Sequence, residues 1–123
     1  MKNQFAGYKE AKELSELGFS EECFGGYLKK DKIIWIGYVS SQGGEQFNRY
    51  YHILAPTFSQ AFSFFREKYD LYYTIEGSKK EGFQYFVYTY EYEIKSEELF
   101  KTYEETELAC LVKLIEIIKE NKL

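Results

Sequence analysis

Residues 83–94, FQYFVYTYEYEI, alternate between two sets of side chains for longer than any other segment of the chain. A period of two is the signature of a β-strand, and aromatic and β-branched residues favour a pleated surface. The pattern predicts one long strand with a buried and a solvated face. We expect the last helix of the chain to cover the face formed by Phe86, Tyr88, Tyr90, Tyr92 and Ile94.

Two segments in the first half of the chain have the spacing of amphipathic helices. The first, residues 8–17, is followed by Gly18, which can take the left-handed conformation that closes a helix. The second ends near Tyr69 and follows Thr57, whose hydroxyl can form a capping box with the Gln60 side chain.

A third helix is expected from residue 103 to about 121, because Thr102 and Glu105 form another capping box ahead of a broad apolar stripe. We expect that stripe to be one broad apolar face, with Lys113, Glu116 and Glu120 on the opposite side. The stripe consists of Leu108, Cys110, Leu111, Val112, Leu114, Ile115, Ile117 and Ile118.

Shorter strands are expected at 23–28, 33–40, 47–54 and 71–76. Both faces of 33–40 are apolar, so this strand should be central in a sheet or covered. The glycine-containing segment 40–46 that follows it reads as a loop.

The elements follow the order α-β-β-β-α-β-β-α, which belongs to the α+β class. Two hairpins require antiparallel pairs, and the central helix can make one crossover. We therefore expect one domain over residues 1–123, with three helices and a mixed or antiparallel sheet of about five strands.

The amino-acid composition disfavours some kinds of binding partner and suits others. The net charge of −4 would repel the phosphates of nucleic acid, so duplex binding is disfavoured. Aromatic residues make up 20% of the chain, and the 13 tyrosines suit a core that extends to a binding surface. The chain has two cysteines and one histidine, too few soft ligands for a zinc site, and we expect no metal and no cofactor.

The first residues contain no apolar signal core, and the longest apolar run, 33–39, is far too short to span a bilayer. No membrane partner is therefore expected. The cysteines, reduced and buried in this interpretation, agree with a cytoplasmic protein.

Three segments resemble a group of small uncharacterised proteins encoded by phages and prophages of gut anaerobes. They are LSELGFSEECFGGY at 14–27, APTFSQAFSFFREKYDL at 55–71 and KTYEETELACLVKLIEIIK at 101–119, together about 50 residues. Ser20, Glu22, Thr106 and Val112 depart from the pattern of that group. The resemblance implies a phage or prophage origin and a single α+β domain, and it carries over no catalytic residue.

The first candidate site for a ligand is the cluster Arg49, Tyr50, Tyr51 and His52, with Gly43 and Gly44 in the loop before it. Arginine can hold a phosphate with two hydrogen bonds, and tyrosine offers a plane on which a base can stack. The cluster suits a small nucleotide-like ligand, with the loop closing over it. An ordinary cross-strand pair at a sheet edge would show the same residues.

An enzymatic alternative uses His52, the only histidine, together with Glu91 or Glu93. The two glutamates would share a strand face about 7 Å apart, which suits a catalytic pair of carboxylates. A solvated polar face explains the same spacing, and no serine or cysteine lies in a nucleophile motif. We therefore assign no catalytic residue and expect a protein that is not an enzyme.

A protein partner is the third possibility. The row Tyr88, Tyr90 and Tyr92 could form an interface with another protein or a second copy of the chain if no helix covers it. Combining these observations, we expect a phage-encoded, non-enzymatic binding protein acting in the host cytoplasm. It would counter a defence by occupying a host protein or sequestering a small nucleotide-like signal; the alternatives are a small hydrolase or nucleotide-modifying enzyme, and a structural or accessory phage protein.

Overall fold

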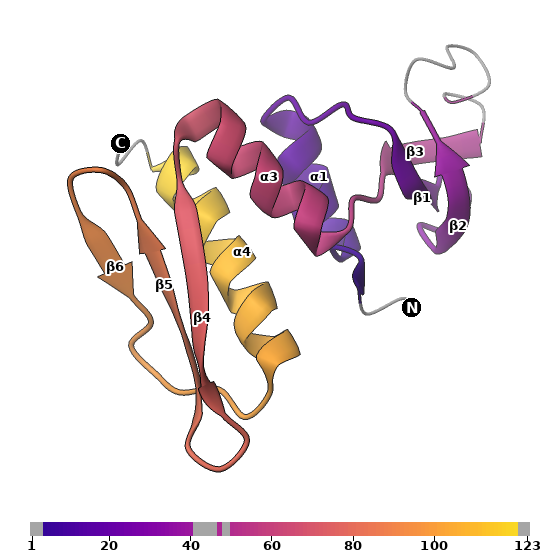
Figure 1. Ribbon diagram of the computed structural model, residues 1–123. Helices are drawn as coiled ribbons and strands as arrows, with labels where there is room; N and C mark the ends of the chain where they lie inside the picture. Colours follow the sequence, from indigo (N-terminus) through magenta and orange to yellow (C-terminus); the bar gives the residue numbers. More distant parts are fainter. Residues whose placement is uncertain (1–3, 41–46, 48–49, 121–123) are drawn as a thin grey trace. The chain divides into compact units, whose positions relative to one another are not determined.

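The computed structural model describes residues 4–40, 47 and 50–120 (Figure 1). The chain divides into two compact units, residues 1–61 and 62–123, and the boundary falls inside helix α3 (Phe58–Tyr69). Each unit has its own three-stranded sheet and is described separately.

Unit 1 begins with helix α1 (Tyr8–Glu16), which ends as its sequence predicts. Gly18 has a φ of 101°, a conformation that glycine adopts without steric cost. Its N–H donates to the Ser15 carbonyl at 3.0 Å, and the Phe19 N–H donates to the Leu14 carbonyl at 3.0 Å. These two bonds make a Schellman motif and satisfy carbonyls left over at the helix end.

The sheet of unit 1 is antiparallel and contains strands β1 (Cys23–Leu28), β2 (Ile34–Val39) and β3 (Tyr51–Leu54) in the order β2-β1-β3. The strand expected over 47–54 starts only at Tyr51, because Phe47 and Tyr50 are helical. Strand β2, expected to be central or covered, lies at an edge, and Trp35 and Tyr38 remain 44% and 63% exposed.

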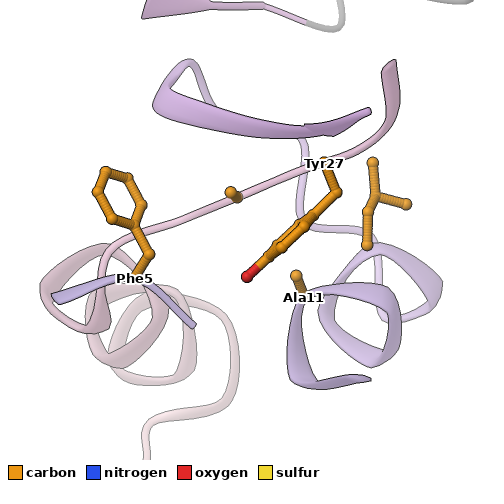
Figure 2. Packing of buried hydrophobic residues seen from close by; sticks show 5 residues of the cluster. Phe5, Ala11 and Tyr27 are labelled. Carbon is orange, nitrogen blue, oxygen red and sulfur yellow. The ribbon is translucent and has the colours of Figure 1, made fainter. Parts of the chain in front are cut away.

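Tyr27 belongs to a cluster of buried residues in unit 1 and lies between Phe5 and Ala11 of helix α1 (Figure 2). The Tyr27 hydroxyl donates to the Ala6 carbonyl, so this buried phenol has a partner. Gly25 and Gly26 allow close packing on both faces of β1. A Cβ at Gly25 would lie 2.9 Å from the Phe5 ring, and one at Gly26 would lie 2.8 Å from the Tyr51 ring.

The capping box of α3 is confirmed. The Gln60 N–H donates to Thr57 Oγ1 at 3.2 Å, and the Thr57 N–H donates to Gln60 Oε1 at 3.1 Å. The helix ends at Tyr69, ahead of Asp70 in the left-handed conformation with φ 57°.

Unit 2 contains strands β4 (Tyr72–Ser78), β5 (Gly82–Tyr88) and β6 (Glu93–Lys95) in the order β4-β5-β6. All pairs are antiparallel. The single strand expected over 83–94 is therefore wrong, since the chain reverses between β5 and β6. Thr89 stabilises that turn, because its hydroxyl accepts hydrogen bonds from the Glu91 and Tyr92 N–H groups at 3.1 and 3.2 Å.

Helix α4 (Tyr103–Lys119) covers one face of this sheet, but not the expected one (Figure 1). Val87 is fully buried, and the Phe83 ring meets the Tyr103 ring edge-to-face at 6.2 Å. Ile94 pairs with Val87 and therefore lies on the covered face too. Phe86 and Tyr88 lie on the other face, so the prediction inverted the sides of β5.

The apolar stripe of α4 is only partly buried. Thr102 caps the helix as predicted, accepting from the Glu105 N–H at 3.1 Å. Leu108 and Val112, two members of the predicted apolar face, remain 41% and 40% exposed. The buried positions of the helix are Thr106, Cys110, Leu111, Leu114, Ile115 and Ile117.

The α+β class is confirmed, with helices α1, α3 and α4 in the part of the chain that the structure describes. The predicted sheet of about five strands is corrected to two antiparallel sheets of three strands each. Two features account for the difference. The turn at Thr89 divides one predicted strand into β5 and β6, and the six strands belong to two units, β1 to β3 in unit 1 and β4 to β6 in unit 2.

Candidate functional site

Two adjoining hollows in unit 2 lie beside helix α4, with volumes of about 680 and 480 Å³. They share one wall and are treated as a single site, the α4 groove. The shared wall is formed by Tyr85, Glu98, Phe100, Lys113 and Glu116.

The segment 96–100 forms one side of the α4 groove and is held firmly against β5. The Phe83 and Phe100 backbones exchange two hydrogen bonds of 2.8 Å each. Buried Ser96 accepts from the Tyr85 N–H at 3.2 Å and donates through Oγ to the Glu98 carbonyl at 3.1 Å. The Phe100 ring is thereby fixed in a stacked arrangement with Tyr85, with centroids 6.3 Å apart.

The opposite side is a strip of helix α4. Leu108, Ala109 and Val112 line the second hollow, and Val112 lies four residues after Leu108 and three after Ala109, on the same side of the helix. They face the Tyr85 and Phe100 rings, so the hollow has apolar side chains on both sides.

The rim of the α4 groove is charged, and carboxylates outnumber ammonium groups. Lys113 forms an ion pair with Glu116, with Nζ 3.2 Å from Oε1. Lys95 is the other ammonium group that lines the two hollows, whereas the carboxylates are Glu97, Glu98, Glu105 and Glu116.

Burial, and secondarily the neighbouring acidic groups Cys110, Glu116, Glu97 and Glu98, raises the pKa of Tyr85. The phenol therefore stays protonated at neutral pH and keeps a hydrogen that it can donate. An apolar groove with an acidic rim suits a ligand that has apolar side chains beside positive charges.

The expected nucleotide cluster is only partly described. Arg49, Gly43 and Gly44 lie outside the described residues, and Tyr50 is exposed. Tyr51 contacts Trp35 and Phe47, with ring centroids 5.9 and 5.8 Å away. His52 instead contacts Tyr8, with ring centroids 5.7 Å apart, and Tyr8 in turn contacts Tyr27. Tyr51 and His52 therefore contact different aromatic side chains, as expected for neighbours on opposite faces of a strand.

The proposed catalytic partners do not share a strand face. Glu91 lies in the turn after β5, Glu93 begins β6, and His52 belongs to unit 1. Both cysteines are buried free thiols. Burial raises the pKa of both thiols to about 12, with a smaller contribution from Glu21 at Cys23 and from Glu107 at Cys110. Both thiols are therefore protonated at neutral pH and are poor nucleophiles.

The tyrosine row expected as an interface is not continuous. Tyr88 lies on the face that α4 leaves open and stacks on Tyr72 at 5.9 Å. Tyr90 is 95% exposed in the turn, and Tyr92 follows it there. These three side chains belong to a strand end and a turn rather than to one strand face.

The residues of the α4 groove were missed because Leu108 and Val112 were grouped with the rest of the apolar face of the last helix and not considered as a binding surface. A usable signal was present: the apolar stripe is wider than one small sheet can cover. Phe100 gave no comparable signal, because its position depends on hydrogen bonds to Phe83, distant in sequence.

Comparisons of the chain with protein-family models, curated proteins and solved structures found no match. The described residues include no helix that is long and apolar enough to cross a membrane. In the same ranges, no three His, Cys, Asp or Glu side chains are grouped so that they could hold a metal ion.

Proposed function

We propose that this chain is a non-enzymatic binding protein that holds a basic amphipathic segment of another protein in the α4 groove. The observation that supports this proposal is the pairing of exposed Leu108 and Val112 with the Tyr85–Phe100 wall under an acidic rim. Apolar helix positions that stay in water on a folded protein are typical of partner-binding grooves.

The physical chemistry of the groove selects the partner. An apolar anchor between Val112 and Phe100 would gain about 1.5–3 kcal/mol if it were fully buried. Lysine or arginine residues next to the anchor would meet Glu98 and Glu105, whereas acidic residues there would be repelled. The charges of the groove thus favour a cationic segment over an anionic one. Burial favours a segment that has an apolar side chain to insert.

The resemblance of segments 14–27, 55–71 and 101–119 to phage and prophage proteins supports a host protein as the partner. A phage protein that occupies a host protein in the host cytoplasm could block a defence without chemistry of its own. High thiol pKa values agree with a non-enzymatic role, since neither cysteine is a ready nucleophile.

The test uses two synthetic amphipathic helices that share the same leucine positions and differ in having lysine or glutamate elsewhere. Amide chemical-shift changes should appear around Leu108, Val112 and Phe100 with the lysine peptide, and the glutamate peptide should cause few. Equal responses to both peptides, or changes confined to unit 1, would contradict the proposal.

A matched pair of variants locates the binding. Val112→Asp places a charge in the apolar side of the groove and should abolish the response to the lysine peptide. Leu99→Asp makes the same change at an exposed leucine that does not line either hollow, and it should bind as the wild type does. Equal loss in both variants would mean that net charge, not the groove, controls binding.

A nucleotide-like ligand is the second candidate, and the aromatic group Trp35, Phe47 and Tyr51 favours it. Incubation of the protein with a nucleotide extract, followed by heat denaturation, separates the classes. An intact nucleotide in the supernatant indicates sequestration, and an altered one indicates the enzymatic alternative. If the supernatant contains no nucleotide, a protein partner is the class of ligand that remains.

A further inference from the structure

We propose that strand β2 pairs with β2 of a second copy of this chain, antiparallel across a two-fold axis, to join two three-stranded sheets into one. This proposal concerns unit 1 and is independent of the α4 groove. Edge-to-edge pairing of identical strands is a self-complementary contact that closes as a dimer.

The backbone of β2 has a free edge in the described part of the chain, where β1 is its one strand neighbour. The Leu28 N–H donates to the Ile33 carbonyl at 3.0 Å, and Gly26 pairs with Trp35. Because backbone groups alternate along a strand, those of Ile34 and Ile36 point away from β1, up to a register shift between Ile36 and Val39. These two residues offer N–H and C=O groups to a further strand.

The side chains of β2 lack the charges and prolines that protect an isolated edge. Residues 33–39, IIWIGYV, contain no charge and no proline, and Trp35, Ile36 and Tyr38 are all exposed. Sheet edges that remain alone in solution usually have charges, prolines or bulges that prevent pairing. The one register shift between β1 and β2 lies after Ile36, beyond the residues that we propose to pair. The pattern that predicted a covered strand therefore agrees with a strand covered by another molecule.

Charges at the two ends of β2 favour a second copy in antiparallel orientation. Lys29, Lys30 and Lys32 lie before the strand, with Asp31 among them. Glu21 and Glu22 lie at the other end, because they directly precede Cys23, which pairs with Val39. Antiparallel pairing brings the basic end of each copy to the acidic end of the other, whereas parallel pairing would bring like charges together.

The outward-pointing groups also define a register. Using both positions in antiparallel pairing places Ile34 of each copy opposite Ile36 of the other. Two β-branched residues opposite one another make a favourable cross-strand pair. The two-fold axis then passes beside Trp35.

The first test is the mass in solution by sedimentation equilibrium. The wild-type chain, 14.7 kDa, should behave as a dimer, and Ile36→Lys should raise the dissociation constant at least about tenfold by placing a charge in each of the two Ile34–Ile36 pairs. Circular dichroism of the variant should match that of the wild type. A wild-type protein that stays monomeric at millimolar concentration would overturn the proposal.

Charge exchange tests the orientation. Lys30→Glu with Lys32→Glu, and separately Glu21→Lys with Glu22→Lys, should each weaken the dimer by placing like charges opposite one another. The chain with all four substitutions should recover wild-type affinity. Failure of that rescue, with both double variants folded, would exclude antiparallel pairing.

Cysteine cross-linking tests the register even if Ile36→Lys does not fold. Trp35 faces the Trp35 of the second copy as a pair that is not hydrogen-bonded, with Cα atoms about 4.5 Å apart, within the range of a disulfide. Trp35→Cys should therefore form a linked dimer rapidly on mild oxidation. Ile33→Cys, about 13 Å from its copy, should not, and equal rates would refute the register.

The proposed dimer and the proposed binding of a peptide in the α4 groove can be contradicted independently of one another. Val112→Asp lies in unit 2 and should leave the mass of the dimer unchanged, whereas Ile36→Lys should still bind the lysine peptide. Loss of dimerisation in Val112→Asp would contradict an interface formed by β2.

Discussion

At the scale of single residues, Glu107 in helix α4 has a carboxyl group whose ionised form is disfavoured by its surroundings in the folded chain. Burial, and secondarily the Glu104 carboxylate, raises the pKa of Glu107 above its ordinary value of 4.5. The ionised carboxylate is thus less favourable in the folded chain than in the unfolded chain. This group favours folding below its unfolded pKa, and that contribution is lost as the pH rises through the folded pKa.

Glu107→Gln should therefore raise the melting temperature at pH 7 and leave it nearly unchanged near pH 3, where the wild-type carboxyl is neutral. Thermal unfolding at the two pH values measures the difference. Glu67→Gln removes an exposed charge from α3 and serves as the control, with no comparable gain. A gain in Glu107→Gln that is the same at both pH values would point to packing rather than charge.

A second residue-scale prediction concerns the two kinds of apolar position on α4. Leu111 is fully buried, so Leu111→Ala should lower the free energy of unfolding by about 2–5 kcal/mol, by lost burial and an incompletely filled cavity. Leu108→Ala removes the same atoms from a side chain 41% exposed and should cost clearly less. Urea unfolding of both variants gives the comparison, and equal costs would contradict the division of the stripe into core and groove.

At the scale of elements, the sequence predicted helix ends well and sheet faces badly, for one physical reason. Gly18, Thr57 and Thr102 act on backbone groups within a few residues, so their effect can be read locally. Which face of β5 is covered depends on packing with distant α4, and both faces of 83–94 carry aromatic residues. The alternation was real, but it could not show which side was buried.

The turn at Thr89 is the element-scale feature that the alternating pattern concealed. Thr89→Val keeps the shape of the side chain and removes the acceptor for the Glu91 and Tyr92 N–H groups, at a cost of about 1–3 kcal/mol for any group left buried without a partner. Hydrogen exchange of the β6 amides should accelerate in this variant.

Thr89→Ser, which retains the hydroxyl, should keep most of the protection of β6. If Thr89→Val exchanges as slowly as the wild type, the turn would be held by strand pairing alone. The comparison therefore separates the contribution of the hydroxyl from that of the β5–β6 ladder.

At the scale of the whole molecule, a single domain over residues 1–123 stays a prediction, since the chain forms two compact units. Helix α3 crosses their boundary without a break. Unfolding of either unit would remove packing from part of this helix, and we therefore expect one cooperative transition.

Trp35, the only tryptophan, belongs to unit 1, so its fluorescence follows that unit. Leu111→Ala, a change in unit 2, should shift the fluorescence transition and the circular dichroism transition by the same amount. Two separated transitions would show that the units unfold independently. The wild-type protein supplies the reference, measured at the same concentration so that any dimer contributes equally.

The buried thiols have a practical consequence, because each unit contains one of them: Cys23 in unit 1 and Cys110 in unit 2. A maleimide can reach either sulfur only after the surrounding side chains separate, so the rate of alkylation at each cysteine measures how often its own half of the chain opens. Peptide mass spectrometry of partly alkylated protein would then give two opening rates from the natural sequence, without any substitution.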